Sequence, residues 1–184
     1  IFHLVTHAFF KALLFLGSGS VIHAMGGEQD MQKMGGLRTK LPWTYGTFLI
    51  GTLAIAGVPL LAGFFSKDEI LGSTFGASPV LWGIGLLTAG LTAFYMWRAV
   101  SLTFHGKFRG THEQEHHLHE SPRVMTLPLV VLAVGAALAG YAGKIPFTHY
   151  DWFGHFLSRV VVEVPGLEKH AEHHSLNLEL ALVG

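Results

Sequence analysis

Four long apolar stretches run through the first 142 residues of the chain, separated by polar or glycine-rich segments. They cover about residues 2–23, 42–71, 80–104 and 124–142. A helix of about 20 predominantly apolar residues is long enough to cross a bilayer. The pattern therefore predicts an all-α fold, a polytopic transmembrane helix bundle, with residues 1–142 as its membrane domain.

The stretch at 42–71 is interrupted by residues that disfavour a continuous helix. Gly57, Pro59 and Gly63 lie inside it, and a proline in a helix removes a donor and clashes with the carbonyl four residues earlier. About 30 residues are too many for one straight span and too few for two. We expect a broken helix, with halves at 42–57 and 64–75 and an unwound link at 58–63. Transporters place ion sites at such breaks.

The remainder, residues 143–184, has a different pattern. It contains the amphipathic, aromatic-rich run FTHYDWFGHFLSRVVVEV, which is typical of an interfacial segment. Residues 176–184 are again apolar and resemble the start of a further span. Because the chain begins with Ile inside an apolar run and ends in another, we interpret it as a fragment cut at both ends.

Three ionisable residues stand in the first apolar stretch at spacings of four: His3, His7 and Lys11. This spacing places them on one helical face. A lysine at the centre of a membrane span costs about 2.5–3.5 kcal/mol and usually faces a bundle interior or a water-filled cavity. We expect the three side chains to form part of a proton path and to face the bundle, toward Lys67. In the alternative interpretations, Lys11 extends to the interface and the histidines are satisfied core groups.

A second charged group opens the second half-helix, where Lys67, Asp68 and Glu69 are consecutive. Charged residues at membrane depth need partners or water, and carboxylates are favoured near a helix N-terminus. Counting along the helix from Pro42 places the break beyond the bilayer midplane. We therefore favour a functional site over the alternative, in which residues 64–69 form an interfacial loop.

Composition agrees with a membrane protein. Half of the residues are hydrophobic and 13% are charged, and the mean hydropathy is +0.43. The formal net charge of zero gives no reason to expect nucleic acid as a partner. The sequence has no cysteine, which excludes disulfides and cysteine-ligated iron–sulfur clusters. We find no phosphate-binding or cofactor motif and expect neither a cofactor nor a metal in this chain.

The loops suggest an orientation. Residues 24–41 and 105–123 each carry three Lys or Arg, whereas 72–79 carries none. The positive-inside rule places the two basic loops on the cytoplasmic side, or on the matrix side of an organelle, although 143–174 also carries three such residues. Histidines crowd two loops, where they could share a metal ion, but we favour solvated loops. They are His112, His116, His117, His119, His170, His173 and His174.

Three segments carry a resemblance to a known family. They read HLVTHAFFKALLFLGSGSVIHA, MQKMGGLRTKLP and GVPLLAGFFSKDEIL. Together they resemble the largest antiporter-like subunit of proton-pumping NADH:quinone oxidoreductase, respiratory complex I. The resemblance is good over about residues 1–142 and loose beyond. It implies a helix bundle with two broken helices in the membrane arm, among other membrane-arm subunits, in a bacterial inner membrane or its organellar equivalent.

The resemblance also implies roles for individual residues. Lys11 matches the family's buried lysine, with His3 and His7 as relay histidines, and Lys67 beside Asp68 matches the lysine of the second broken helix. Protons would cross a hydrated chain of such groups, driven by quinone reduction in other subunits, with no redox chemistry in this chain. The earlier broken helix is missing, so the chain would not pump alone. Alternatives are a subunit of a multisubunit cation/proton antiporter or membrane-bound hydrogenase, and a scaffold whose charges merely pair.

Overall fold

A computed structural model describes residues 1–143, 155 and 156, and these residues form helices and loops without a strand. The α-helices are α1 (Phe2–Ala24), α2 (Pro42–Ala56), α3 (Ala62–Ala77), α4 (Pro79–Phe104), α5 (His112–His117) and α6 (Arg123–Leu138). Three short 3₁₀ helices are η1 (Met31–Lys33), η2 (Leu37–Thr39) and η3 (Ala139–Ala142). The amphipathic run and the start of a further span expected in 143–184 lie almost entirely outside the described residues.

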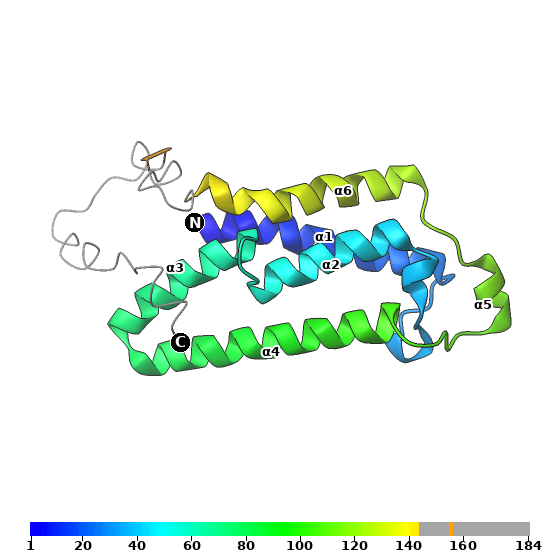
Figure 1. Ribbon diagram of the computed structural model, residues 1–184, viewed down its shortest axis with the longest axis horizontal. Helices are drawn as coiled ribbons and strands as arrows, with labels where there is room; N and C mark the ends of the chain where they lie inside the picture. The colour runs from blue at the N-terminus through cyan, green and yellow to red at the C-terminus, as the bar shows by residue number, and fades with distance from the viewer. Residues whose placement is uncertain (144–154, 157–184) are drawn as a thin grey trace.

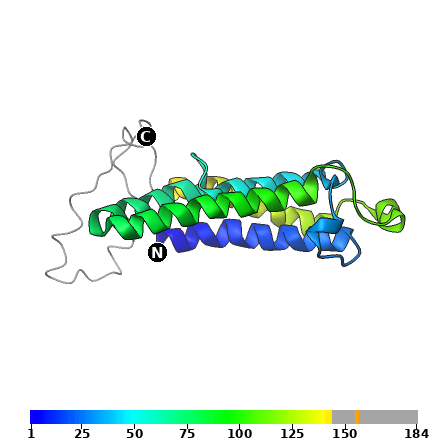
Figure 2. The ribbon, with the colours of Figure 1, turned by 90° about the horizontal axis from the view of Figure 1, so that it is seen from below.

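Helices α1, α2, α4 and α6 lie side by side along the long dimension of the molecule. In Figure 1, α1, α2 and α6 lie together, α3 continues from α2, and α4 runs back along them; Figure 2 shows the same elongated bundle from below. Residues 25–41 and 105–122, with α5, lie at one end, which we call the loop end. The N-terminus and the α3–α4 turn lie at the opposite end.

In the part of the chain that the structure describes, three helices are long and apolar enough to cross a membrane: α1, α4, and α6 together with η3. The shorter α2 and α3 follow one another in the chain as two half-helices. The predicted all-α transmembrane bundle with a broken helix is therefore confirmed.

The break is set by the end of α2. Gly57 has φ 85°, the left-handed conformation that favours glycine, and the N–H groups of Gly57 and Val58 donate to the carbonyls of Ala54 (3.1 Å) and Leu53 (3.0 Å). These bonds form a Schellman motif, a frequent helix terminator. Residues 57–61 are not helical. The unwound link predicted at 58–63 therefore starts one residue later and ends two residues later than the observed one.

Gly63 has a different role from the predicted one. It lies in the first turn of α3 rather than in the link. A Cβ at this position would collide with the carbonyl oxygen of Ala54 in α2. The glycine therefore lets the two half-helices approach closely, a packing requirement that the sequence alone did not distinguish from a helix breaker.

Two apolar clusters hold the helices together. One lies toward the loop end, where the last turns of α1 and α4 meet the start of α2 around Val21, Phe48 and Phe104. The other joins α1, α2 and α6 around Phe10, Ala54 and Leu129. By contrast, α4 buries only residues near its C-terminal end against the rest of the described chain. Within the described residues, most of its remaining apolar surface is exposed.

Glu120 joins three helices at the loop end. Its carboxylate accepts from the backbone N–H groups of Trp43 (2.8 Å) and Thr44 (3.3 Å), at the first turn of α2. The Thr44 hydroxyl also donates to it (2.7 Å) and lies 2.8 Å from the Ser20 hydroxyl of α1. Ser20 donates to the hydroxyl of Ser121, just before α6, at 2.7 Å. A carboxylate at a helix N-terminus is stabilised by the helix dipole, so Glu120 caps α2 from a distant loop.

Arg109 connects the two loops of this end. Its guanidinium donates to the carbonyls of Gln32 (2.7 Å) and Leu102 (2.7 Å). Leu102 belongs to the last turn of α4, whose carbonyls have no partner within the helix. Elsewhere in the same loop, the Asp30 backbone and then the Lys33 ammonium, 3.0 Å away, lower the pKa of the Glu28 carboxyl.

Candidate functional site

A polar cluster lies where the first turns of α1 and α3 meet. Ser66 of α3 is 1% exposed and Thr6 of α1 is fully buried. The His3 Nδ1 atom lies 2.9 Å from Ser66 Oγ, and the Thr6 hydroxyl donates to Ser66 Oγ, also at 2.9 Å. The ring of His7 lies one turn further along α1, with its centroid 5.7 Å from that of His3. Two of the predicted site residues are thus neighbours of a hydroxyl pair in α1 and α3.

Lys67 is half-buried and lies against the end of α2. Its ammonium donates to the carbonyl of Ile55. The Schellman motif already satisfies the carbonyls of Leu53 and Ala54, and Lys67 satisfies the next one. The C-terminus of a helix carries partial negative charge and favours cations. Lys67 directly follows Ser66, whose hydroxyl lies against His3 Nδ1, so the break lies next to the histidine pair.

Lys11 does not share this position. Its side chain is exposed on the described part of the chain, with Nζ 5.7 Å from the ring centroid of Phe15. The prediction that it faces Lys67 is therefore wrong for the described helices. The cause is geometric, because a step of four residues turns roughly 40° more than one full helical turn. From His3 through His7 to Lys11, the series leaves the buried face that holds Thr6 and Phe10.

Asp68 also points away from the cluster. Asp68 and Glu69 are exposed, and neither takes part in a salt bridge within the described residues. Sequence neighbours on a helix face in different directions, and here the buried direction is taken by Ser66 and, partly, Lys67. The structure therefore brings together His3, His7 and Lys67, and leaves Lys11 and Asp68 on outer surfaces of α1 and α3.

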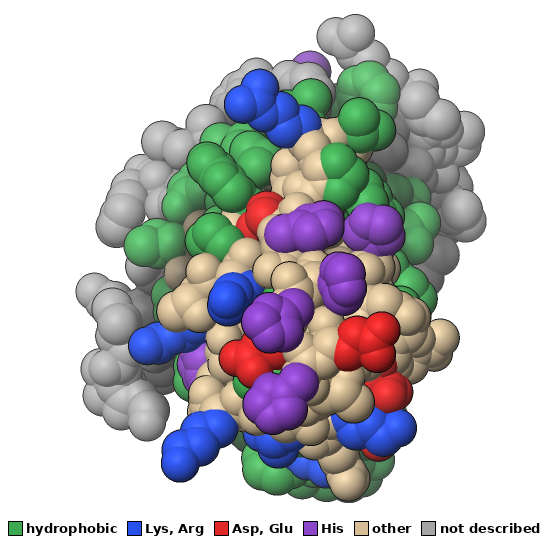
Figure 3. Space-filling view, turned by 90° about the vertical axis from the view of Figure 1, so that its right-hand side faces the viewer, with side chains coloured by type: hydrophobic (Ala, Val, Ile, Leu, Met, Phe, Trp, Pro, Cys, Tyr) green, Lys and Arg blue, Asp and Glu red, His purple; other side chains and the backbone are tan. Residues whose placement is uncertain are grey.

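The histidines of the loop end are far from this cluster. Figure 3 shows histidine side chains on this end of the molecule, mixed with acidic and basic ones. Among the described residues, no three His, Asp or Glu are placed to hold a metal ion. His119 Nδ1 lies 3.0 Å from the carbonyl of Glu120, and His105 Nε2 lies 3.1 Å from the Tyr45 hydroxyl. The second predicted histidine group, at 170–174, lies outside the described residues.

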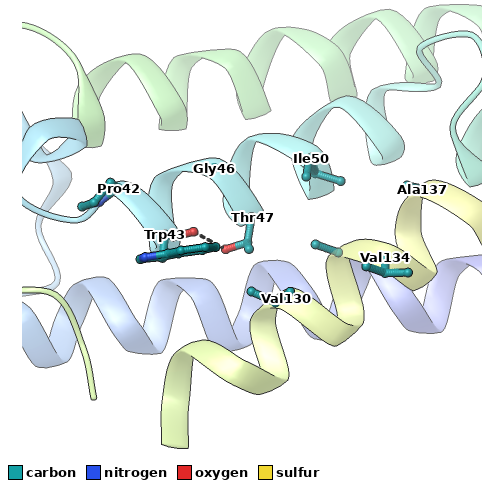
Figure 4. Close-up of a pocket in the computed structure, with 9 residues that line it drawn as sticks. Pro42, Trp43, Gly46, Thr47, Ile50, Val130, Val134 and Ala137 are labelled. Carbon is teal, nitrogen blue, oxygen red and sulfur yellow. Dashed lines mark hydrogen bonds between the residues drawn. The ribbon is translucent and has the colours of Figure 1, made fainter. Parts of the chain in front are cut away.

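A groove of about 450 Å³ lies elsewhere, between α2 and α6. Figure 4 shows Trp43 across one end of it and Ile50, Val130 and Val134 along its length. The single hydroxyl in its lining, that of Thr47, is bonded to the carbonyl of Trp43 at 2.9 Å. A groove lined almost entirely by apolar side chains is not suited to binding an ion, so we place the site at the polar cluster.

Sequence reasoning missed Ser66, Thr6 and the Ile55 carbonyl. A weak signal existed for the two hydroxyls, since Ser66 directly precedes Lys67 and Thr6 follows His3 by three residues inside an apolar run. A backbone acceptor leaves no such signal, because every residue has a carbonyl.

Comparisons with known proteins agree on one family. A family model described as "NADH:quinone oxidoreductase/Mrp antiporter, TM" matches residues 1–92. The chain is 55% identical over 169 residues to NAD(P)H-quinone oxidoreductase chain 5 of a Picosynechococcus species, covering 78% of this chain and 26% of that protein. It is 55% identical over 156 residues to NADH-quinone oxidoreductase subunit L of Mycobacterium tuberculosis, covering 83% of this chain and 24% of that protein.

A third relative, NADH-quinone oxidoreductase subunit L of Rhodobacter capsulatus, is 52% identical over 151 residues, covering 76% of this chain and 21% of that protein. The chain therefore spans about a quarter of the length of these relatives. All the residues of the polar cluster lie within the part matched by the family model.

Proposed function

The chain belongs to the NADH:quinone oxidoreductase/Mrp antiporter transmembrane family, and we propose that it forms part of a proton-translocating membrane-arm subunit of an NADH:quinone oxidoreductase. The names of its relatives support this choice within the family. In this proposal, redox chemistry takes place in other subunits, and the chain moves protons among its own titratable side chains without a cofactor of its own.

One observation carries the proposal: the Lys67 ammonium donates to the C-terminal end of a broken helix, and no carboxylate pairs with it within the described residues. The Ile55 carbonyl and the dipole of α2 favour the charged form of Lys67. Burial favours the neutral amine. A group balanced between these effects can release or take up a proton when a nearby charge changes, and His3 is a titratable group that contacts Ser66, the residue before Lys67.

His3 and His7 would carry protons along α1. Their rings are adjacent, and imidazole titrates near neutral pH when unperturbed. Lys11 lies one turn beyond His7 and continues the series toward the outer surface of α1. An ammonium in lipid costs about 2.5–3.5 kcal/mol. We infer that another part of the longer protein covers Lys11 and supplies the next group in the path. Asp68, exposed beside Lys67, is the corresponding candidate on α3.

The proposal is tested by Lys67→Ala and Lys11→Ala in the complete subunit, assembled in its complex in membrane vesicles. Each variant should lose most of its proton uptake during quinone reduction while the complex assembles, because removing an ammonium relieves a membrane-insertion cost of a few kcal/mol. Lys107→Ala is the matched control, since Lys107 is an exposed lysine of the loop end and should keep full pumping.

Two results would contradict the proposal. One is normal proton uptake in both variants. The other is sodium-dependent proton exchange in vesicles without any quinone substrate, which would instead support a cation/proton antiporter subunit.

A further inference from the structure

Ser66 is the point where the polar groups of α1 and α3 converge. Two partners lie close to its Oγ, namely His3 Nδ1 and Thr6 Oγ1, both at 2.9 Å. Two weaker partners, the carbonyls of Ala62 and Gly63, lie at 3.4 Å in the first turn of α3. The serine is almost fully buried, and buried hydroxyls in folded proteins are hydrogen-bonded. Its single proton therefore has to be shared among a defined set of acceptors.

Thr6, Ser66 and His3 all have hydrogen-bond partners when His3 has no proton on Nδ1. Thr6 then donates to Ser66, and Ser66 donates to the Nδ1 lone pair. A hydroxyl offers one donor and two acceptor sites. Each of the three groups is satisfied by a bond of normal length.

All three groups also have partners when Nδ1 carries a proton, provided that the Ser66 hydroxyl turns. His3 then donates to Ser66, Thr6 still donates to Ser66, and the Ser66 proton turns to the carbonyl of Ala62 or Gly63. Both of these acceptors lie directly after the break between α2 and α3. An alanine at position 66 could serve neither state: Thr6 would keep the backbone carbonyl of His3, 3.1 Å from its hydroxyl, as an acceptor, but the Nδ1 atom of His3 would lose its partner on α3.

We propose that Ser66 is a positioning residue that holds His3 against α3 in both of its proton states and turns its hydroxyl toward the helix break when Nδ1 is protonated. This inference rests on the proposed function, because His3 changes its proton state only if it takes part in proton transfer. It adds a residue next to Lys67 that passes no proton itself but holds the histidine ring against α3, one position before the lysine.

The chain offers a matched control on the same helix. Ser73 is an exposed serine of α3 whose hydroxyl donates to the carbonyl of Glu69 at 2.8 Å. Ser66→Ala and Ser73→Ala each remove one hydroxyl from α3, but only Ser66→Ala removes a hydrogen-bond partner of His3. Ser66→Thr keeps the hydroxyl and serves as the conservative variant.

The experiment measures proton uptake during quinone reduction by the assembled complex in vesicles, with complex yield on a native gel. We expect Ser66→Ala to slow proton uptake about tenfold, the scale of a hydrogen bond to a charged group, with normal complex yield. Ser73→Ala should pump normally, and Ser66→Thr should recover most of the rate. In a His3→Gln background, adding Ser66→Ala should cause little further loss, because the two residues act together.

Other outcomes distinguish a failure of the Ser66 proposal from a failure of the proposed function. If His3→Gln slows pumping but Ser66→Ala does not, or if the two losses multiply, Ser66 has no positioning role while the proposed function stands. If His3→Gln and Lys67→Ala both pump normally, the proposed function itself fails. A Ser66→Ala complex that is poorly assembled and is not rescued by Ser66→Thr would mark the serine as a packing residue and would also overturn the inference.

Discussion

At the scale of single residues, the main finding is the partner of Lys67. A lysine ammonium inside a membrane protein pairs with another charged group or with a backbone carbonyl, and the adjacent Asp68 suggests a carboxylate partner in the sequence. The structure gives the ammonium a backbone carbonyl at a helix end instead, while Asp68 is exposed. A helix end supplies a fixed partial charge that does not itself titrate. Proton release from Lys67 would therefore be governed by His3 and by groups outside the described residues.

Lys11 allows a prediction that separates proton transfer from charge alone. Lys11→Arg keeps a positive charge on the outer face of α1, but a guanidinium stays protonated and cannot release its proton. We expect proton uptake to fall strongly while complex yield stays normal, measured in vesicles and on a native gel. Lys40→Arg, at an exposed lysine of the loop end, should leave both unchanged. Full pumping in Lys11→Arg combined with lost assembly in Lys11→Ala would show that Lys11 is a structural charge.

At the scale of elements, the break between α2 and α3 depends on Gly57. Gly57→Ala places a side chain at φ 85°, a conformation that costs a non-glycine residue about 1 kcal/mol. The added Cβ would also lie 3.4 Å from the Lys67 side chain. We expect a lower midpoint of thermal unfolding for the complex in detergent and a slower proton uptake.

The control for this change lies on the same helix. Gly46 is an ordinary helical position of α2, and a Cβ there meets nothing within 4 Å. Gly46→Ala should be neutral or slightly stabilising, because alanine favours a helix over glycine by about 0.5–1 kcal/mol. Equal effects of the two substitutions would show that the left-handed turn at Gly57 does not hold the break in place.

These elements also show how far the sequence could be interpreted. Gly57 and Pro59 placed the break correctly, because both act through their own backbone. Gly63 was misread because its role is an approach to Ala54 in another helix. The contacts of Glu120 and Arg109 join segments more than 70 residues apart, and nothing in the local pattern names such a partner. The spacing of His3, His7 and Lys11 predicted a shared face, but the slow rotation of a four-residue step decided which side chains are buried.

At the scale of the whole molecule, the charged groups are segregated along the bundle. The basic loops and the histidines of α5 gather at the loop end (Figure 3), whereas the polar cluster lies toward the opposite end, near the N-terminus and the α3–α4 turn. Between the two, the described core is almost entirely apolar apart from hydroxyl side chains. The positive-inside rule predicts that the loop end faces the cytoplasm or matrix, and the cluster would then belong to the half of the path nearer the other side.

This orientation can be measured with single cysteines, because the described chain has none of its own. In an otherwise cysteine-free complete subunit, Lys107→Cys at the loop end and Ala77→Cys at the α3–α4 turn would both be exposed. We expect a membrane-impermeant maleimide to label Lys107→Cys only from the cytoplasmic or matrix side, and Ala77→Cys only from the other. The reverse pattern would invert the orientation, and labelling of both from one side would contradict the transmembrane path of α4.

The central claim, that Lys67 exchanges a proton at the helix break, is tested most directly by Lys67→Arg. An arginine can still donate to the Ile55 carbonyl and cap α2, but it cannot release its proton. The measurement is proton uptake per quinone reduced by the assembled complex in vesicles, alongside complex yield. The account predicts normal yield with proton uptake reduced as strongly as in Lys67→Ala. Normal uptake in Lys67→Arg, with poor assembly in Lys67→Ala, would show that Lys67 only caps the helix and would contradict the account.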